Sequence, residues 1–174
     1  KGHAIRVGVA HARGSLMAQI DADLQFLPEE LPRLLSPLVA GRADVVLGSR
    51  FAPGARRLGA AAPHRSVGNR LVSAYVSALW RRGLTDVLAG FKAWTREAIE
   101  AVAPRIDGYG YELEIPARAL GLGLEVTEVP ITTRARAAGR SKVAVARVGA
   151  RLLVDATCLR LGRARPVGSG ARSR

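Results

Sequence analysis

Two acidic residues stand one residue apart directly after an apolar run. Residues 16–20 read LMAQI, and Asp21, Asp23 and Gln25 follow. If the strand continues through them, the two carboxylates share one face with Ala22 turned inward, because alternate residues of a strand point the same way. Like charges this close repel unless a cation lies between them. Mg²⁺ accepts one or two carboxylates together with phosphate oxygens, so the pattern predicts a divalent metal site with Gln25 as a neutral third ligand.

The same two acids have a plainer interpretation. A helix is expected to begin at Pro28, where proline is tolerated and where Glu29 and Glu30 favour the helix dipole. Asp21 and Asp23 would then only cap that helix, as acidic side chains often do. Spacing alone leaves both interpretations open.

Strands and helices alternate around this segment. Two apolar strands joined by a helix form a βαβ unit, which indicates a mostly parallel sheet flanked by helices, in the α/β class. Ligands bind at the carboxyl ends of the strands in such sheets, where Asp21 and Arg50 lie. The predicted elements of this half are a helix over 2–13, a strand over 16–20 buried on both faces, a helix from Pro28 to Gly41 and a strand over 43–51.

The second half begins with a long segment rich in Gly, Pro, Ala and Arg. Loops of this length are often functional, and we expect Arg56 and Arg57 within it to close over a substrate as a lid. The predicted elements after it are a helix over 68–80, a short strand within 84–94, a helix capped by Thr95 and a half-exposed strand over 124–133.

The positive charge is concentrated near the end of the chain. The net charge is +13, and residues 134–174 hold eleven of the 27 Lys and Arg but one of the 14 Asp and Glu. Such a segment attracts nucleic acid or the anionic face of a bilayer. A nucleic-acid-binding protein would carry basic residues interleaved with stacking aromatics over its body. Aromatic residues make up only 5%, so we expect a membrane surface and no nucleic acid as partner.

An apolar stripe of Val145, Val148, Leu152 and Leu153 predicts an amphipathic helix in the basic segment. This helix either lies on a bilayer or packs on the domain, and both remain open. We expect three parts: a catalytic domain over 1–142, the helix over 143–162 and a disordered tail over 163–174. The chain contains no run of about 18 apolar residues, and its single Cys158 cannot form an internal disulfide.

Five blocks in the same order make the sequence resemble the family 2 glycosyltransferases, especially the polyprenyl-phosphate sugar transferases typified by dolichol-phosphate mannose synthase. The resemblance covers about residues 1–145. It implies a GT-A fold and an inverting transfer of mannose or glucose from GDP-mannose or UDP-glucose to dolichyl or undecaprenyl phosphate, at the cytoplasmic face of the cell membrane. The blocks are IDADLQFLPEELPRLLSPLVAGRADVVLGSRF, HRSVGNRL, LTDVLAGFKAW, YELE and VPITTRARAAGRSK.

The resemblance also implies a role for individual residues. Asp21, Asp23 and Gln25 would hold Mg²⁺ or Mn²⁺ against the donor diphosphate, and the metal would neutralise charge on the leaving group. The acceptor phosphate is already anionic, so no strong general base is required. The candidate set is Asp23, Arg136 and Glu112 as catalytic residues; Arg50 and Arg65 for the acceptor phosphate; Arg136 and Lys142 for the donor diphosphate; and Ser49, Asn69, Asp86 and Ser141 as further substrate-binding residues.

Several alternatives stay open at this point. Asp86 fits an Asx-type turn as well as a sugar contact, and Glu112 and Glu114 fit a helix start. A saccharide acceptor would need Glu112 or Asp86 as a base. The family has an N-terminal strand–loop–strand portion that holds the nucleotide base, and none precedes Lys1. We therefore expect an N-terminally truncated chain with an unpaired sheet edge, with an inactive fragment as a further alternative.

Overall fold

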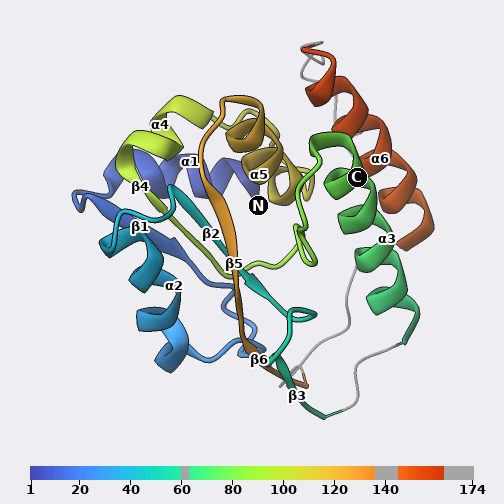
Figure 1. Ribbon diagram of the computed structural model, residues 1–174, viewed down its shortest axis with the longest axis horizontal. Helices are drawn as coiled ribbons and strands as arrows, with labels where there is room; N and C mark the ends of the chain where they lie inside the picture. Colours follow the sequence, from blue (N-terminus) through green and yellow to red (C-terminus); the bar gives the residue numbers. More distant parts are fainter. Residues whose placement is uncertain (60–62, 136–144, 163–174) are drawn as a thin grey trace, which may run out of the picture.

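The computed structural model describes residues 1–59, 63–135 and 145–162. Helices and strands alternate along the chain, as the α/β pattern predicts (Figure 1). The elements are α1 (Gly2–His11), β1 (Leu16–Gln19), the short 3-10 helix η1 (Pro28–Glu30), α2 (Leu31–Val39), β2 (Val45–Ser49), β3 (Arg56–Leu58), α3 (Pro63–Trp80), β4 (Lys92–Thr95), α4 (Arg96–Val102), α5 (Tyr111–Gly121), β5 (Val126–Pro130), β6 (Thr132–Arg134) and α6 (Val145–Arg160).

The main sheet has four strands in the order β1-β4-β2-β5. β4 runs antiparallel to both β1 and β2, whereas β2 and β5 are parallel. The prediction of a mostly parallel sheet is therefore wrong, and the sheet is mixed. β1 and β2 do run in the same direction, as a βαβ unit requires, but β4 from the second half of the chain is inserted between them.

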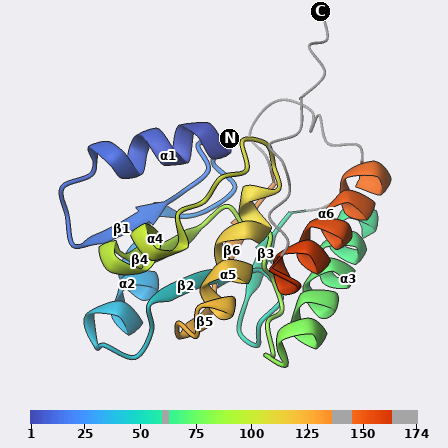
Figure 2. The ribbon, with the colours of Figure 1, turned by 90° about the horizontal axis from the view of Figure 1, so that it is seen from above.

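Each face of the sheet has its own hydrophobic core. Val45 and Leu47 of β2 face a core that also contains side chains of α1, α3, α4, α5 and α6. Val46, between them, points to the other face and packs with Leu34 and Leu38 of α2. This is the period of two expected for a strand buried on both faces. Figure 2 shows α1 and α2 on opposite sides of the sheet.

β1 is an edge strand and is not buried on both faces as predicted. Met17 and Gln19 are buried, whereas Leu16 is half-buried and Ala18 is exposed. Among the described residues β1 pairs only with β4. In the described part of the chain, the other edge of β1 has no strand paired to it.

A second, two-stranded sheet pairs β3 with β6 in parallel. The single strand predicted over 124–133 is thus divided between two sheets, with buried Ile131 between β5 and β6. The segment rich in Gly, Pro, Ala and Arg that was expected to form a long loop covers residues 52–66, and it contains β3 and the start of α3. The predicted cap of α4 is confirmed, because Thr95 Oγ1 accepts a hydrogen bond from the Ala98 N–H at 3.1 Å.

α6 packs against α3 and α5, beside the sheet (Figures 1 and 2). Leu152 and Ala156 are buried in this contact, and the hydroxyls of Tyr75 and Thr157 are 2.7 Å apart. Of the two interpretations of the amphipathic helix, the structure shows packing on the domain. None of the helices in the described ranges combines the length and apolar character needed to cross a bilayer.

The packing of α6 makes a prediction about stability. Leu152→Ala should lower the free energy of unfolding by about 2–5 kcal/mol, because it leaves a cavity in a buried contact. The matched change Leu153→Ala, at a side chain that is 37% exposed, should cost less than about 1 kcal/mol. Urea denaturation followed by circular dichroism measures both. Equal costs for the two variants would contradict the packing of α6 on α3 and α5.

Candidate active site

Functional side chains meet at one edge of the main sheet. The carboxyl ends of β1 and β2 and the start of β4 lie at this edge, because β4 runs antiparallel to its neighbours. Asp21 follows β1, Arg50 follows β2, and Gly90 precedes β4. α5 begins with Tyr111 and Glu112, and Glu112 contributes to the electrostatic environment of Arg50, as Asp21 does. Asp21 and Arg50 thus follow strands that end at the same edge of the sheet, with β4 between them. A direct approach of Arg50 to Asp21 stays a prediction.

Asp21 lies in a space that only glycine leaves open. β1 ends at Gln19, and the chain then turns away from the sheet through Leu24, whose φ is +60°. A Cβ atom at Gly90 would lie 2.3 Å from Asp21 Oδ2. A side chain at Gly90 would therefore displace the Asp21 carboxylate, so Gly90 is part of the site.

Asp23 belongs to a local turn rather than to the strand. Its Oδ1 accepts a hydrogen bond from the Gln25 N–H at 3.2 Å, as in an Asx turn. Ala22 is exposed and not turned inward as predicted, because the strand periodicity stops at Gln19. The next helix, η1, has Leu27 as its N-cap and no side-chain capping bond. The capping interpretation of the acid pair is therefore wrong.

The candidate metal ligands suit a cation whose coordination shell is completed by the substrate. The described residues contain no group of three or more His, Cys, Asp and Glu able to hold a metal ion. Mg²⁺ is often bound by one or two carboxylates and completes its shell with water and substrate phosphates. Asp21 and Asp23 meet that requirement, with Asp21 held against Gly90. Gln25 as a third ligand remains a prediction.

Lys1 contacts Asp21, although no sequence pattern predicted it as a site residue. Its Nζ donates to Asp21 Oδ1 and Oδ2 at 2.8 and 2.7 Å and lies 3.6 Å from Glu112 Oε1. It also lies 5.6 Å from the centre of the Tyr109 ring. Burial alone would lower the pKa of Lys1, but the hydrogen bond with Asp21 and the charge of Glu112 outweigh it. The pKa of Lys1 is therefore raised, and its side chain is an ammonium ion.

Glu112 is held from the interior by a second lysine, Lys92, which is buried. Lys92 has no exposed surface, and its Nζ donates to Glu112 Oε2 at 2.6 Å and to the Ala89 carbonyl at 2.7 Å. The Tyr111 hydroxyl donates to Glu112 Oε1 at 2.7 Å and accepts from Gln19 Nε2 at 2.5 Å. Burial and the nearby Glu112 charge raise the pKa of Tyr111, so its hydroxyl stays protonated as a donor.

A second network joins the end of β2 to β5. Arg50 donates through Nε and Nη2 to Asp86 at 2.6 and 2.8 Å, and its backbone N–H does so at 3.0 Å. Glu128 accepts from the N–H groups of Thr85 and Asp86 and from the Thr85 hydroxyl. Burial raises the pKa of Glu128, although these hydrogen bonds oppose the shift. The hydroxyls of Ser49 and Thr85 are 2.5 Å apart.

Two predicted contacts have structural partners in these networks. The Asp86 side chain is 0% exposed and both its oxygens accept from Arg50, so it positions Arg50. A contact of Asp86 with a sugar stays a prediction. Glu114 is also buried and accepts from the N–H groups of Arg105 and Ile106. Arg50 itself keeps 23% of its side chain exposed, and its Nη1 makes no hydrogen bond to any residue that the structure describes.

Three arginines surround Phe51 at the same end of β2. The guanidinium carbons of Arg57 and Arg70 lie 4.8 and 4.9 Å from the Phe51 ring centre, and that of Arg50 lies at 5.7 Å. Arg57 also donates to Ser66 Oγ at 3.1 Å. Arg70 was not predicted from the sequence. Its place within the HRSVGNRL block was the available signal.

The structure describes only some of the remaining predicted site residues. Asn69 lies on α3 and is half-buried. Arg65 lies in the first turn of α3, and its side chain is not among those described. Arg136, Ser141 and Lys142 lie outside the described residues. The predicted grip on the donor diphosphate therefore remains a prediction.

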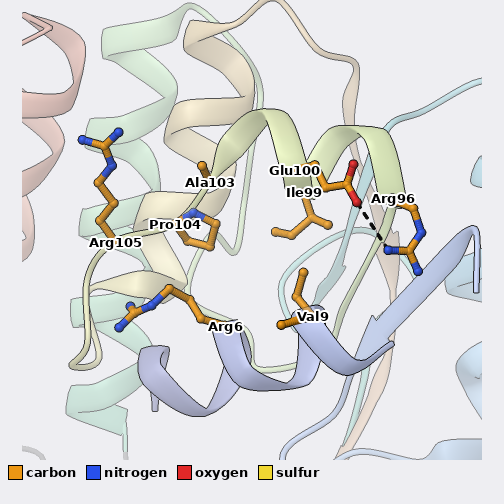
Figure 3. A pocket seen from close by; sticks show the side chains of 9 residues that line it. Arg6, Val9, Arg96, Ile99, Glu100, Ala103, Pro104 and Arg105 are labelled. Carbon is orange, nitrogen blue, oxygen red and sulfur yellow. Dashed lines mark hydrogen bonds and ion pairs between the residues drawn. The ribbon is translucent and has the colours of Figure 1, made fainter. Parts of the chain in front are cut away.

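A separate pocket of about 460 Å³ lies between α1 and α4 (Figure 3). Val9 and Ile99 face each other across it, and Arg6, Arg96 and Arg105 stand around it. Arg96 is tied to Glu100 at 3.3 Å. None of the candidate residues lines this pocket, so the candidate active site is the sheet edge.

Comparisons with known proteins agree on the family and the fold. A family model described as glycosyl transferase family 2 matches residues 1–103. The chain is 36% identical over 139 residues to polyprenol monophosphomannose synthase of Mycolicibacterium smegmatis, covering 74% of this chain and 49% of that protein. It is 33% identical over 137 residues to undecaprenyl-phosphate mannosyltransferase of Micrococcus luteus, covering 77% and 55%. The chain thus spans about half the length of these relatives.

Solved structures show the same fold. One described as a mycobacterial protein has a TM-score of 0.71 at 24% identity, covering 95% of this chain and 52% of that one. Glucosyl-3-phosphoglycerate synthase from Mycobacterium tuberculosis, in complex with Mn²⁺, UDP and glucosyl-3-phosphoglycerate, has a TM-score of 0.65 at 22% identity, covering 95% and 56%. The predicted GT-A fold is thereby confirmed, with the correction that the sheet is mixed.

Asp86 could position Arg50 or contact the sugar, and its burial against Arg50 predicts the first role. Asp86→Asn should lower the free energy of unfolding by about 3 kcal/mol, because Arg50 loses the charge that offsets its desolvation. Glu100→Gln, which breaks the exposed pair with Arg96, should change it by less than about 1 kcal/mol. Thermal and urea denaturation measure both. Unchanged stability in Asp86→Asn with a raised KM for the sugar donor would instead support direct contact with the sugar.

Proposed function

Because the chain belongs to glycosyltransferase family 2, we propose that the complete gene product transfers a sugar from a nucleotide-diphosphate sugar to a polyprenyl phosphate, with a divalent metal. GDP-mannose and UDP-glucose are the proposed donors. The observation that carries this proposal is that side chains suited to a metal ion and a side chain suited to a phosphate lie at the same edge of the main sheet. Asp21 and Asp23 offer carboxylates to a metal, and Arg50, oriented by Asp86, offers a guanidinium to a phosphate.

Each side of the proposed site matches one substrate. A bound Mg²⁺ or Mn²⁺ on Asp21 and Asp23 would neutralise the charge that grows on the leaving diphosphate. Mn²⁺ is included because a protein of this fold is known in complex with Mn²⁺ and UDP. The guanidinium groups of Arg50, Arg57 and Arg70 around Phe51 would bind the acceptor phosphate, since arginine grips phosphate oxygens through paired hydrogen bonds.

The state of Glu112 favours a phosphate acceptor over a saccharide. A sugar hydroxyl needs a general base to remove its proton, whereas a phosphate oxygen is already a nucleophile. Glu112 is neutralised by Lys92 at 2.6 Å and accepts from Tyr111 at 2.7 Å. These contacts occupy both carboxylate oxygens of Glu112 with donors from within the protein. The other candidate base, Asp86, is fully buried on Arg50.

The face made by β3 and the first half of α3 supports contact with a membrane. Leu58, Val67 and Leu71 are 51%, 57% and 64% exposed, and the bond from Arg57 to Ser66 brings β3 to α3. Apolar side chains that enter the interface, flanked by arginines that attract anionic lipid, are typical of peripheral membrane proteins. Because α6 is packed on the domain, we place the bilayer contact on this face, at the cytoplasmic side of the membrane.

The metal site is tested by a single substitution. Asp23→Ala in the complete gene product should abolish transfer from labelled GDP-mannose or UDP-glucose to a short polyprenyl phosphate, because the leaving diphosphate loses its metal ligand. Extraction of lipid-linked label, with Mg²⁺, with Mn²⁺ and with EDTA, measures the loss. Circular dichroism checks that the variant folds. Undiminished metal-dependent transfer in Asp23→Ala would refute the assignment.

The membrane face is tested with vesicles. The double variant Val67→Glu, Leu71→Glu should float with anionic vesicles at least about tenfold less than the unchanged protein, because two apolar contacts become charges that the bilayer repels. Val39→Glu on α2, at a side chain that is 74% exposed, is the matched control and should leave flotation unchanged. Equal flotation of both would move the membrane contact elsewhere. Binding to RNA without binding to vesicles would favour the nucleic-acid alternative.

A further inference from the structure

The ammonium group of Lys1 stands where a metal would contact Asp21. It donates to both carboxylate oxygens, at 2.8 and 2.7 Å, so no oxygen of Asp21 is left without a cation. A divalent ion that uses Asp21 as a ligand must either displace this ammonium or share the carboxylate with it. Sharing is unfavourable, because a divalent and a monovalent cation would then be a few ångströms apart.

The charges around Lys1 are nearly balanced without a metal. Asp21 and Glu112 contribute two negative charges, and Lys1 and Lys92 contribute two positive ones, all within one chain of ion pairs at 2.7, 3.6 and 2.6 Å. Arg50 and Asp86 form a further neutral pair beside them. Such a cluster attracts a free divalent cation weakly, but a diphosphate brings additional negative charge and changes that balance.

The structure also gives Lys1 a second carboxylate. Glu112 Oε1 lies 3.6 Å from Lys1 Nζ, and Lys92 and Tyr111 hold Glu112 in position from the other side. A small rotation of the Lys1 side chain would strengthen that ion pair as the one with Asp21 is lost. Displacement from Asp21 would therefore not leave the ammonium without a partner.

We propose that Lys1 is a resident cation of the site, which the divalent metal displaces from Asp21 only when a nucleoside diphosphate arrives with it. Lys1 thereby makes metal binding and donor binding cooperative, and it keeps the site closed to free metal. This inference rests on the metal site of the proposed function.

The experiment measures Mn²⁺ binding by the loss of the free-ion electron paramagnetic resonance signal, which needs no catalytic turnover. The complete gene product is titrated with Mn²⁺ alone, with Mn²⁺ and UDP, and with Mn²⁺ and GDP. The unchanged protein should bind Mn²⁺ at least about tenfold more tightly with one of the nucleotides. Lys1→Gln should bind Mn²⁺ alone at least about tenfold more tightly than the unchanged protein, so that the gain from nucleotide shrinks by about the same factor.

Two further variants control this comparison. Lys1→Arg keeps a cation in place and should retain the gain from nucleotide. Arg13→Gln removes an exposed charge two residues beyond the C-terminal end of α1 and should also retain it. If Lys1→Gln leaves the gain unchanged while the unchanged protein binds Mn²⁺ with nucleotide, the role of Lys1 is refuted and the metal site stands. If the unchanged protein binds no Mn²⁺ even with UDP or GDP, both proposals fail.

Discussion

The ion pair between Lys92 and Glu112 is the interaction on which the sheet-edge site depends. Lys92 is fully buried in β4, and its Nζ joins Glu112 of α5 to the Ala89 carbonyl. Ala89 precedes Gly90, which lies against Asp21, and Glu112 faces Lys1 on the same side. A buried ammonium is unfavourable unless its partners satisfy it, so these partners must hold their positions whenever the chain is folded. One lysine thus fixes the backbone behind Asp21 and the carboxylate beside Lys1.

Some charged side chains of the site are engaged by other residues and hold them in position, whereas others can still bind a ligand. Asp86 and Glu128 are occupied by Arg50 and by the turn at Thr85, and Glu112 is occupied by Lys92. Asp21 is paired with the single cation of Lys1, and Arg50 keeps one nitrogen without a hydrogen bond to a described residue. We therefore propose that the site binds phosphates and a cation rather than transferring a proton.

The sequence predicted the α/β class, the family and most helices because these depend on local patterns and ordered motifs. It also predicted that Asp21 and Arg50 follow strands that end at the same edge of the sheet, since both come directly after apolar strands that run in the same direction. It did not predict the antiparallel β4, because strand direction depends on a partner distant in sequence. Lys1, Lys92 and Glu128 were missed for the same reason: each acts through a residue at least 20 positions away. The sequence could not decide whether α6 lies on a bilayer or packs on the domain, because the apolar surface that α3 and α5 form for it appears only in the folded structure.

The proposed function depends above all on an acceptor phosphate that needs no general base. The sharpest experiment compares a short polyprenyl phosphate with the corresponding polyprenol as acceptors for the complete gene product, with labelled GDP-mannose or UDP-glucose and Mg²⁺ or Mn²⁺. We expect lipid-linked sugar with inverted anomeric configuration from the phosphate, and none from the alcohol. Comparable transfer to the alcohol, or to a saccharide in place of the lipid, would show that the nucleophile is a hydroxyl and that a general base is at work.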